Sequence, residues 1–511
     1  MVSTVEKAKA AGSPVRNASP VGRRKVVGAT PAKDRVSEYL SRIGPELDRF
    51  LQADHGDAVD RFDEWSRSLA GPLPAEGLGA DAVLGELERD VLPNGMRLAE
   101  PGWWGFITVA PDALPAAVSA AASIASPQRY TITAFNRLEE LSLEWLSQLC
   151  GLDSSLKGVY SSGGSVANLV ALGAARQWAL ERVGVDPAAD GVGSRKVAIY
   201  TSSEAHHTVP RSAAVLGLGR ANVREIRTDE RQRMDPDELR HALAADVGRG
   251  VVPVAVVAAA GTTNTGAIDP LRALGEIARE HGAWFHIDGA YGLPGILDER
   301  VAHLYDGLEL ADSVIVDPHK WLGAPVGIAA TFVRDRSILH RAFTQGAAAY
   351  LEGSFTDAGV RISIDSMGIP YADFAVELSA PARGVVVWSI LRRLGREGMR
   401  ERVCRDNDFA RHLAARVCES EALELLGEPV LSICCFRYVG EGIEDLDGFN
   451  AALFRRLVQE TPYLPSSTVV NGRFAIRPCF INPRTKQAHV DGLVDAVVAI
   501  GDELRVAGET A

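Results

Sequence analysis

The most informative segment of the chain is Asp312-Ser-Val-Ile-Val-Asp-Pro-His-Lys-Trp321. Its first half is short and apolar, which is typical of a strand buried in a parallel sheet. Such a strand delivers Lys320 to its C-terminal end. A second segment of this kind, Ala283-Trp-Phe-His-Ile-Asp288, delivers an acidic side chain to the same edge. Ligands of open α/β sheets bind at these strand ends, so we expect Lys320 and Asp288 to share one site.

The remainder of residues 157–333 alternates between strand and helix patterns. Helical patterns separate several of the strands, as at 166–182, 236–245 and 270–281. This alternation predicts an α/β fold with a seven-stranded, mostly parallel sheet covered on both faces. The seven predicted strands span residues 158–161, 196–201, 223–226, 251–259, 283–288, 312–317 and 328–333.

We predict four regions along the chain. Residues 1–34 are a basic tail, rich in Ala, Gly, Ser and Pro, which we expect to be disordered. Residues 35–125 are an N-terminal helical segment, and residues 126–385 form the large α/β domain. Residues 386–511 form a smaller C-terminal α+β domain.

Charge and composition exclude several classes of function. The formal net charge is −12 although the tail is basic, which argues against nucleic acid as a partner. No apolar run reaches the roughly 18 residues that span a bilayer, and the N-terminus lacks an apolar signal core, so we expect no membrane partner. The six cysteines have no metal-binding spacing. We therefore expect no metal, reduced thiols and a cytoplasmic location.

The residues at the predicted sheet edge suit pyridoxal 5'-phosphate. A lysine beside a histidine can form a Schiff base, and an acid can keep the pyridine nitrogen protonated. Ser161-Ser-Gly-Gly-Ser165 follows a strand and opens a helix, whose free N–H groups can bind a phosphate. His206 follows the next strand and could stack on a planar ring. Each of these segments taken alone is more simply explained as a turn, a helix cap or a surface residue, and their combination favours the cofactor.

The order of the motifs resembles the group II pyridoxal-phosphate decarboxylases, which include aromatic-amino-acid, histidine, glutamate and cysteine-sulfinate decarboxylases. The resemblance runs from about Trp103 to the C-terminus. It rests on Ser-Gly-Gly-Ser-x-Ala-Asn, Ala-His-x-x-Val, Gly-Thr-Thr, His-x-Asp-x-Ala-Tyr and Asp-Pro-His-Lys-Trp, in this order. It implies a fold type I enzyme, similar in fold to aspartate aminotransferase, that forms a homodimer. It also implies decarboxylation of an L-amino acid to the amine and CO₂.

The resemblance also implies roles for matching residues. Lys320 would form the Schiff base, Asp288 would pair with the pyridine nitrogen, and His206 would stack on the ring. Tyr350, in the long loop after the lysine, would protonate the carbanion once CO₂ has left. The further residues implied to contact the cofactor are Gly164, Ser165, Thr263, Ala290 and His319.

The substrate side is less defined by the sequence. Trp103, Trp104 and Phe106 could form an aromatic pocket wall, and core packing explains them equally well. Arg129 and Arg477 could each meet a substrate carboxylate or pair with a local acid. Ser379 is a further candidate contact, although Ser379-Ala-Pro-Ala-Arg383 departs from the Ser-Arg-Arg common in the family. We expect an aromatic L-amino acid as substrate, while small aliphatic and acidic amino acids stay open.

Three other functions are compatible with the same residues. An oxygen-using relative would yield an aldehyde, but that divergence is associated with replacement of the loop tyrosine, and Tyr350 is present. An aminotransferase would use the lysine as a proton shuttle. A catalytically silent binding protein on this fold would have no need of Lys320, Asp288 and His206 together.

Overall fold

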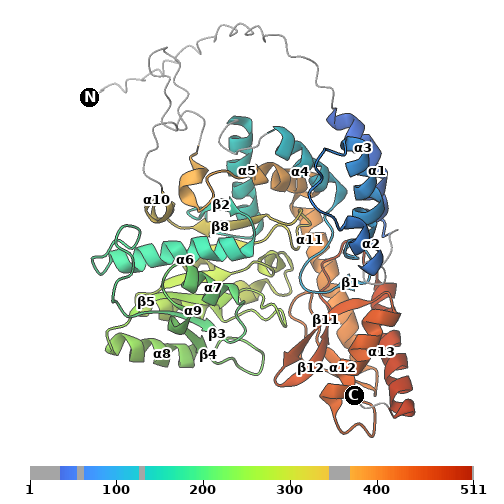
Figure 1. The fold of residues 1–511 in the computed structure, drawn as a ribbon. Helices are drawn as coiled ribbons and strands as arrows, with labels where there is room; N and C mark the ends of the chain where they lie inside the picture. The colour runs from blue at the N-terminus through green and yellow to red at the C-terminus, as the bar shows by residue number, and fades with distance from the viewer. Residues whose placement is uncertain (1–34, 54–61, 126–132, 345–368, 509–511) are drawn as a thin grey trace, which may run out of the picture.

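The computed structural model describes residues 35–53, 62–125, 133–344 and 369–508. Over these residues the chain forms a large α/β unit and a smaller unit around a second sheet (Figure 1). Among the described residues, no helix is both long and apolar enough to cross a membrane.

The large sheet has seven strands in the order β2-β8-β7-β6-β5-β3-β4. Strand β8 is antiparallel to both of its neighbours, and the remaining pairs are parallel. The α/β class and the seven-stranded, mostly parallel sheet are thus confirmed. The strands are β2 (Lys157–Ser161), β3 (Val197–Ser202), β4 (Val223–Ile226), β5 (Val252–Ala259), β6 (Trp284–Asp288), β7 (Ser313–Val316) and β8 (Ala329–Val333).

Helices cover both faces of this sheet, so its central strands are buried and mostly apolar. Helix α6 (Gly164–Glu181) lies on one face with α7 (Thr208–Val215) beside it, and α8 (Pro236–Gly248) and α9 (Leu271–Glu280) lie on the other (Figure 1). The start of α8 shows how the sequence sets these boundaries. The Asp235 carboxylate accepts hydrogen bonds from the backbone N–H groups of Asp237 and Glu238, and Pro236 occupies the first helical turn.

The small sheet combines two distant parts of the sequence. Its order is β1-β11-β12-β10-β9, and β1 (Trp103–Trp104) pairs in parallel with β11 (Leu464–Val470). The small unit therefore takes an edge strand from the N-terminal segment and is not confined to residues 386–511. Its other elements are β9 (Leu423–Leu425), β10 (Phe436–Tyr438), β12 (Arg473–Arg477), α12 (Leu446–Glu460) and α13 (Gln487–Ala507).

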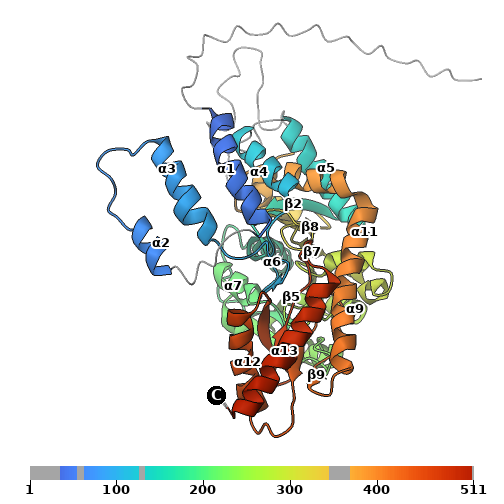
Figure 2. The same ribbon diagram turned by 90° about the vertical axis from the view of Figure 1, so that its right-hand side faces the viewer.

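The long helix α11 (Arg383–Cys418) joins the two units (Figure 1). It packs on α4 and α5 at one end and on α13 at the other. Its axis breaks at Gly395, whose φ of 63° a glycine adopts without a Cβ penalty. Figure 1 and Figure 2 show α1, α2 and α3 gathered on one side of the molecule. The remaining helices are α1 (Val36–Leu51), α2 (Phe62–Leu69), α3 (Ala80–Glu86), α4 (Ala113–Ala125), α5 (Thr133–Leu149) and α10 (Ser337–Phe343).

Candidate active site

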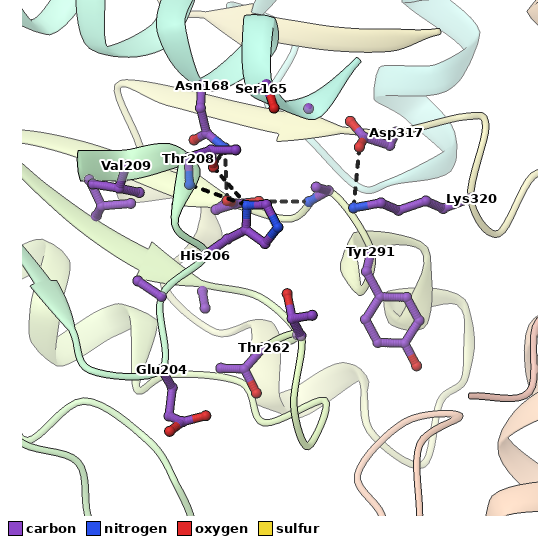
Figure 3. A pocket seen from close by; sticks show the side chains of 18 of the residues that line it. Ser165, Asn168, Glu204, His206, Thr208, Val209, Thr262, Tyr291, Asp317 and Lys320 are labelled. Atoms are coloured by element: carbon purple, nitrogen blue, oxygen red, sulfur yellow. Dashed lines mark hydrogen bonds and ion pairs between the residues drawn. The ribbon is translucent and has the colours of Figure 1, made fainter. Parts of the chain in front are cut away.

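A cavity opens at the carboxyl ends of five parallel strands of the large sheet (Figure 3). The segments after β2, β3, β5, β6 and β7 all contribute to its wall, because parallel strands end at one edge. All eight described residues assigned to the cofactor from the sequence line it. They are Gly164, Ser165, His206, Thr263, Asp288, Ala290, His319 and Lys320.

Lys320 faces a buried carboxylate in this cavity. Its Nζ lies 3.3 Å from Oδ2 of Asp317, which is three residues earlier in the turn after β7 (Figure 3). The ring of His319 lies beside the same carboxylate, with Nε2 3.8 Å from Oδ2. His319 Nδ1 donates to the backbone carbonyl of Ile328, which fixes the orientation of the ring. Burial raises the pKa of Asp317, and the charge of Lys320 opposes this rise.

Asp288, the last residue of β6, is held as an acceptor by two donors. The side-chain amide of Asn168 donates to Oδ2 over 2.9 Å, and the backbone N–H of Ala290 donates to Oδ1 over 3.1 Å. Both oxygens of this carboxylate therefore accept a hydrogen bond and are fixed in orientation. A carboxylate acceptor at this place is what a protonated pyridine nitrogen requires.

His206 lies on the opposite wall, in the loop between β3 and α7. Its Nδ1 lies 2.9 Å from the hydroxyl of Thr208. Burial lowers the pKa of His206 to about 4, with the neighbouring charges of His207 and Lys320 adding to the effect and Asp288 opposing it. The imidazole is therefore neutral at physiological pH.

The start of α6 packs closely against the turn after β7 and borders the cavity. A Cβ added at Gly164 would lie 2.6 Å from the carboxylate of Asp317, so the backbone approaches this wall more closely than any side chain permits. The first N–H groups of α6 and the hydroxyl of the exposed Ser165 adjoin the cavity. One cavity thus brings together a lysine, a carboxylate held by two donors, a neutral imidazole and the free N–H groups at the start of a helix. These groups fit pyridoxal 5'-phosphate.

Comparison with known proteins agrees with this geometry. Residues 114–439 match the pyridoxal-dependent decarboxylase conserved domain. The chain belongs to the pyridoxal-dependent decarboxylase family. It is a pyridoxal-phosphate-dependent amino-acid decarboxylase, a carboxy-lyase of fold type I.

Three relatives show how far the likeness extends. The chain is 30% identical to the aromatic-L-amino-acid decarboxylase of Bacillus atrophaeus, over 72% of this chain and 74% of that protein. It is 32% identical to the L-2,4-diaminobutyrate decarboxylase of Rhizobium meliloti (strain 1021), over 85% and 84%. The crystal structure of Oryza sativa TDC with PLP and tryptamine matches with a TM-score of 0.82 and 27% identity, covering 93% of this chain and all of that one.

Several residues of the decarboxylase site were not assigned from the sequence. Asn168, Thr208, Asp317, Thr262 and Tyr291 also line the cavity. One signal was available for Asn168, because it lies one helical turn after Gly164 and therefore on the same face of α6. For the other four residues the signal was their place in the sequence, because each lies within three residues of an assigned residue, such as Asp317 before Lys320.

The three aromatic residues predicted to form a pocket wall lie in two different places. Trp103 and Phe106 line a groove that meets the cofactor cavity at Thr263. Trp104 does not line either cavity. It is 1% exposed and packs on Tyr463 and Phe480 in the core of the small unit, because alternate residues of β1 point to opposite faces. Its prediction as a substrate contact is corrected to a core role.

The structure also places the other substrate-side candidates. Ser379 is exposed and lines neither the cavity nor the groove, so the structure does not bring it to the site. Arg477 is 3% exposed and donates to the backbone carbonyls of Phe106, Thr263 and Asn264. No acidic side chain among the described residues pairs with it. Arg129 and Tyr350 lie outside the described residues.

Proposed function

We propose that the decarboxylase converts an aromatic L-amino acid to the corresponding amine and CO₂. The observation that carries this proposal is the groove beside the cofactor cavity. Its wall includes the rings of Trp103, Phe106 and Phe454, and Thr263 belongs to both the groove and the cavity. A side chain that extends from the reacting carbon past Thr263 would meet aromatic surface, which binds aromatic groups well.

The backbone at Phe106 supports a functional reason for this ring. Phe106 has a φ of 54°, a left-handed conformation that costs a bulky residue about 1–3 kcal/mol. Its N–H donates to the hydroxyl of Ser466, and its carbonyl accepts from Arg477, so the conformation is held on both sides. The ring is 62% exposed and lies 6.3 Å from that of Trp103. Strain that keeps an aromatic ring exposed is consistent with a ligand contact.

Arg477 offers a charge for the substrate carboxylate. Its guanidinium is buried, and backbone carbonyls accept its described hydrogen bonds. Carbonyl dipoles stabilise the cation without neutralising it, so an anion that enters the groove meets an uncompensated positive charge. An α-carboxylate is the anion that every amino-acid substrate carries.

Each residue of the cavity then has a defined task. Pyridoxal phosphate, when bound, supplies the protonated ring that takes up the electrons released with CO₂. Asp288 keeps the proton at the pyridine nitrogen, and Lys320 holds the cofactor covalently. The start of α6 binds the phosphate, and His206 covers one face of the ring and excludes water from it. Tyr350, which lies outside the described residues, delivers the proton that replaces CO₂.

The proposal includes a cytoplasmic homodimer. Helix α4 supports the dimer, since Leu114 and Ile124 are exposed on a helix that is otherwise rich in alanine. The cysteines of the described residues are all free thiols, which is consistent with a reducing compartment. Light scattering on the purified protein measures the mass of the assembly directly, and a monomer would contradict this part.

A substrate panel tests the proposal. The holoenzyme is incubated with each of the twenty amino acids, DOPA and 5-hydroxytryptophan while CO₂, amine, aldehyde and peroxide are measured together. We expect CO₂ and the matching amine from aromatic substrates. Turnover restricted to acidic or small aliphatic amino acids would overturn the aromatic assignment, and aldehyde without amine would favour the oxygen-using reaction.

Substitutions in the groove test whether its aromatic wall contacts the substrate. Phe106→Ala should lower kcat/KM for the best aromatic substrate by about tenfold or more, the loss expected when one phenyl contact is removed. Phe62→Ala is the matched control, because Phe62 is a similarly exposed phenylalanine on α2. Equal effects of the two substitutions would remove Phe106 from the substrate site.

A further inference from the structure

A chain of buried hydrogen bonds runs from the sheet to the cofactor cavity. Alternate residues of a strand share one face, so His286 and Asp288 both face α6 across the sheet. The side chain of Asn168, from α6, lies between them, with Oδ1 3.0 Å from His286 Nε2 and Nδ2 2.9 Å from Asp288 Oδ2. Asn168 is 2% exposed and His286 is fully buried, so water does not compete with these contacts.

The orientation of the Asn168 amide follows from Asp288. An ionised carboxylate accepts hydrogen bonds only, so it must face the NH₂ group of Asn168. The amide oxygen then faces His286 and accepts from Nε2–H. Burial lowers the pKa of His286 to about 4, so the ring is neutral and its Nδ1 is an acceptor. The hydroxyl of Ser313 lies 2.9 Å from Nδ1 and the Ser313 backbone carbonyl lies 3.3 Å from it, and the hydroxyl accepts from the indole N–H of Trp284 over 2.7 Å.

Two donors of Thr208 determine the tautomer of His206, and the second N–H of the Asn168 amide orients one of them. Asn168 Nδ2 lies 3.2 Å from the hydroxyl oxygen of Thr208, which accepts from it. The Thr208 hydroxyl hydrogen is then free to point to His206 Nδ1, 2.9 Å away, and the Thr208 backbone N–H also points to Nδ1, over 3.4 Å. Nδ1 is therefore an acceptor, and the single proton of the neutral ring resides on Nε2. Figure 3 shows Asn168, Thr208 and His206 next to one another, with Thr208 linking the other two.

We propose that Asn168 is a positioning residue that orients the polar groups on both walls of the cofactor site. Through one N–H it holds the Asp288 carboxylate in place, and through the other it turns the Thr208 hydroxyl hydrogen towards His206 Nδ1, which also accepts from the Thr208 backbone N–H. His206 then presents an N–H donor to the cavity and cannot act as a base there. This inference rests on the proposed roles of Asp288 and His206 and goes beyond them, because Asn168 acts on both.

The test uses two substitutions that separate the two arms. Asn168→Asp keeps the shape of the side chain but replaces the NH₂ group by an acceptor, so it should disturb Asp288 and His206 together. Thr208→Val keeps the shape of Thr208 and removes only the hydroxyl, so it should disturb His206 alone. Asn407→Asp is the matched control, because Asn407 is a buried asparagine on α11 whose amide donates to Asp298 over 2.9 Å away from the cavity.

Two readouts need no substrate. The first is the dissociation constant of pyridoxal phosphate, with the pH midpoint of the bound cofactor's absorbance. The second is the pair of ring ¹⁵N signals of His206 in ¹⁵N-histidine-labelled protein, assigned with His206→Gln, which report the tautomer. Because neither readout depends on the amino acid turned over, a wrong substrate class would leave both unchanged.

We expect Asn168→Asp to raise the dissociation constant by about tenfold or more, the loss expected for one hydrogen bond to a charged group, and to shift the pH midpoint. Thr208→Val should leave the dissociation constant within about twofold and shift the His206 Nδ1 signal, because one of the two donors to Nδ1 is lost. Asn407→Asp should change neither readout. Wild-type cofactor affinity, pH midpoint and His206 signals in Asn168→Asp would overturn the proposal, as would an equal loss of affinity in Asn407→Asp.

Discussion

Lys320 and Asp317 form an ion pair inside the cofactor cavity, with 3.3 Å between Nζ and Oδ2. The Asp317 side chain is 1% exposed, and its second oxygen, Oδ1, accepts no hydrogen bond within the described part of the chain. A buried carboxylate with one unsatisfied oxygen is expensive to ionise, and this cost raises the pKa of Asp317. The amine of Lys320 is thus paired with a carboxylate whose ionisation burial makes costly.

Asp317→Asn should change the pH dependence of stability. A carboxylate whose pKa is higher in the folded than in the unfolded state binds protons preferentially when folded, so its ionisation opposes folding as pH rises above 3.8. The free energy of unfolding of cofactor-free Asp317→Asn, relative to that of the wild type, should therefore increase from pH 4 towards pH 7. Denaturant unfolding at several pH values measures this difference, and a constant difference would contradict the expectation.

Lys320→Ala should abolish CO₂ release while the protein stays folded. The lysine side chain is 20% exposed and contributes little to the core, so its removal affects chemistry more than folding. The variant should lack the absorbance band of the lysine-bound cofactor and keep the assembly mass of the wild type. Lys157→Ala, at the exposed start of β2, is the control and should keep full activity. Unchanged turnover in Lys320→Ala would remove Lys320 from its assignment.

Gly164→Ala should weaken cofactor binding by about tenfold or more through a steric effect, the loss expected for about 1.4 kcal/mol. The new Cβ would meet the Asp317 carboxylate at 2.6 Å, so either the start of α6 or Asp317 must move. Gly248→Ala, in the last turn of α8, is the control because its Cβ has no atom within 4 Å. Titration with pyridoxal phosphate compares the two variants, and equal affinities would show that the start of α6 tolerates a methyl group.

The two buried histidines should make the protein less stable in mild acid. His206 and His286 each have a pKa of about 4, below the ordinary value of 6.5, because burial disfavours the charged ring. The unfolded chain binds more protons than the folded one between these values, so stability is lost as pH falls from 6.5 to 4. His286→Gln should flatten the dependence of the free energy of unfolding on pH in this window. His303→Gln, at an exposed site, should not.

Tyr350→Phe tests the assignment of the protonating residue. Without the phenol, amine formation should fall because the carbanion left by CO₂ is no longer protonated. Oxygen should then react with that carbanion, so aldehyde and hydrogen peroxide should appear. Products are quantified together in air-saturated buffer and under nitrogen. Unaltered amine output would exclude Tyr350 from this role.

The sequence predicted the large sheet because its signal is local. Each predicted strand ends within one residue of the observed one, since short apolar runs bounded by turns are typical of strands buried on both faces. The motifs after these strands predicted that Lys320, Asp288 and His206 meet in one place, and all three line the same cavity because parallel strands carry their terminal residues to one edge. The small unit was predicted less well, since β1 pairs with β11 more than 350 residues away and no local pattern records that pairing.

By itself, the sequence determined the α/β class, the cofactor and the residues that follow each strand, because these depend on strand periodicity and on residue type. Which donor faces which acceptor depends instead on how the elements pack together. The contact between Asn168 and His286, the burial of Trp104 and the interaction of Arg477 with backbone carbonyls all join segments distant in sequence. Hydrogen bonds act over about 3 Å, so their partners are fixed only when packing has brought the elements together.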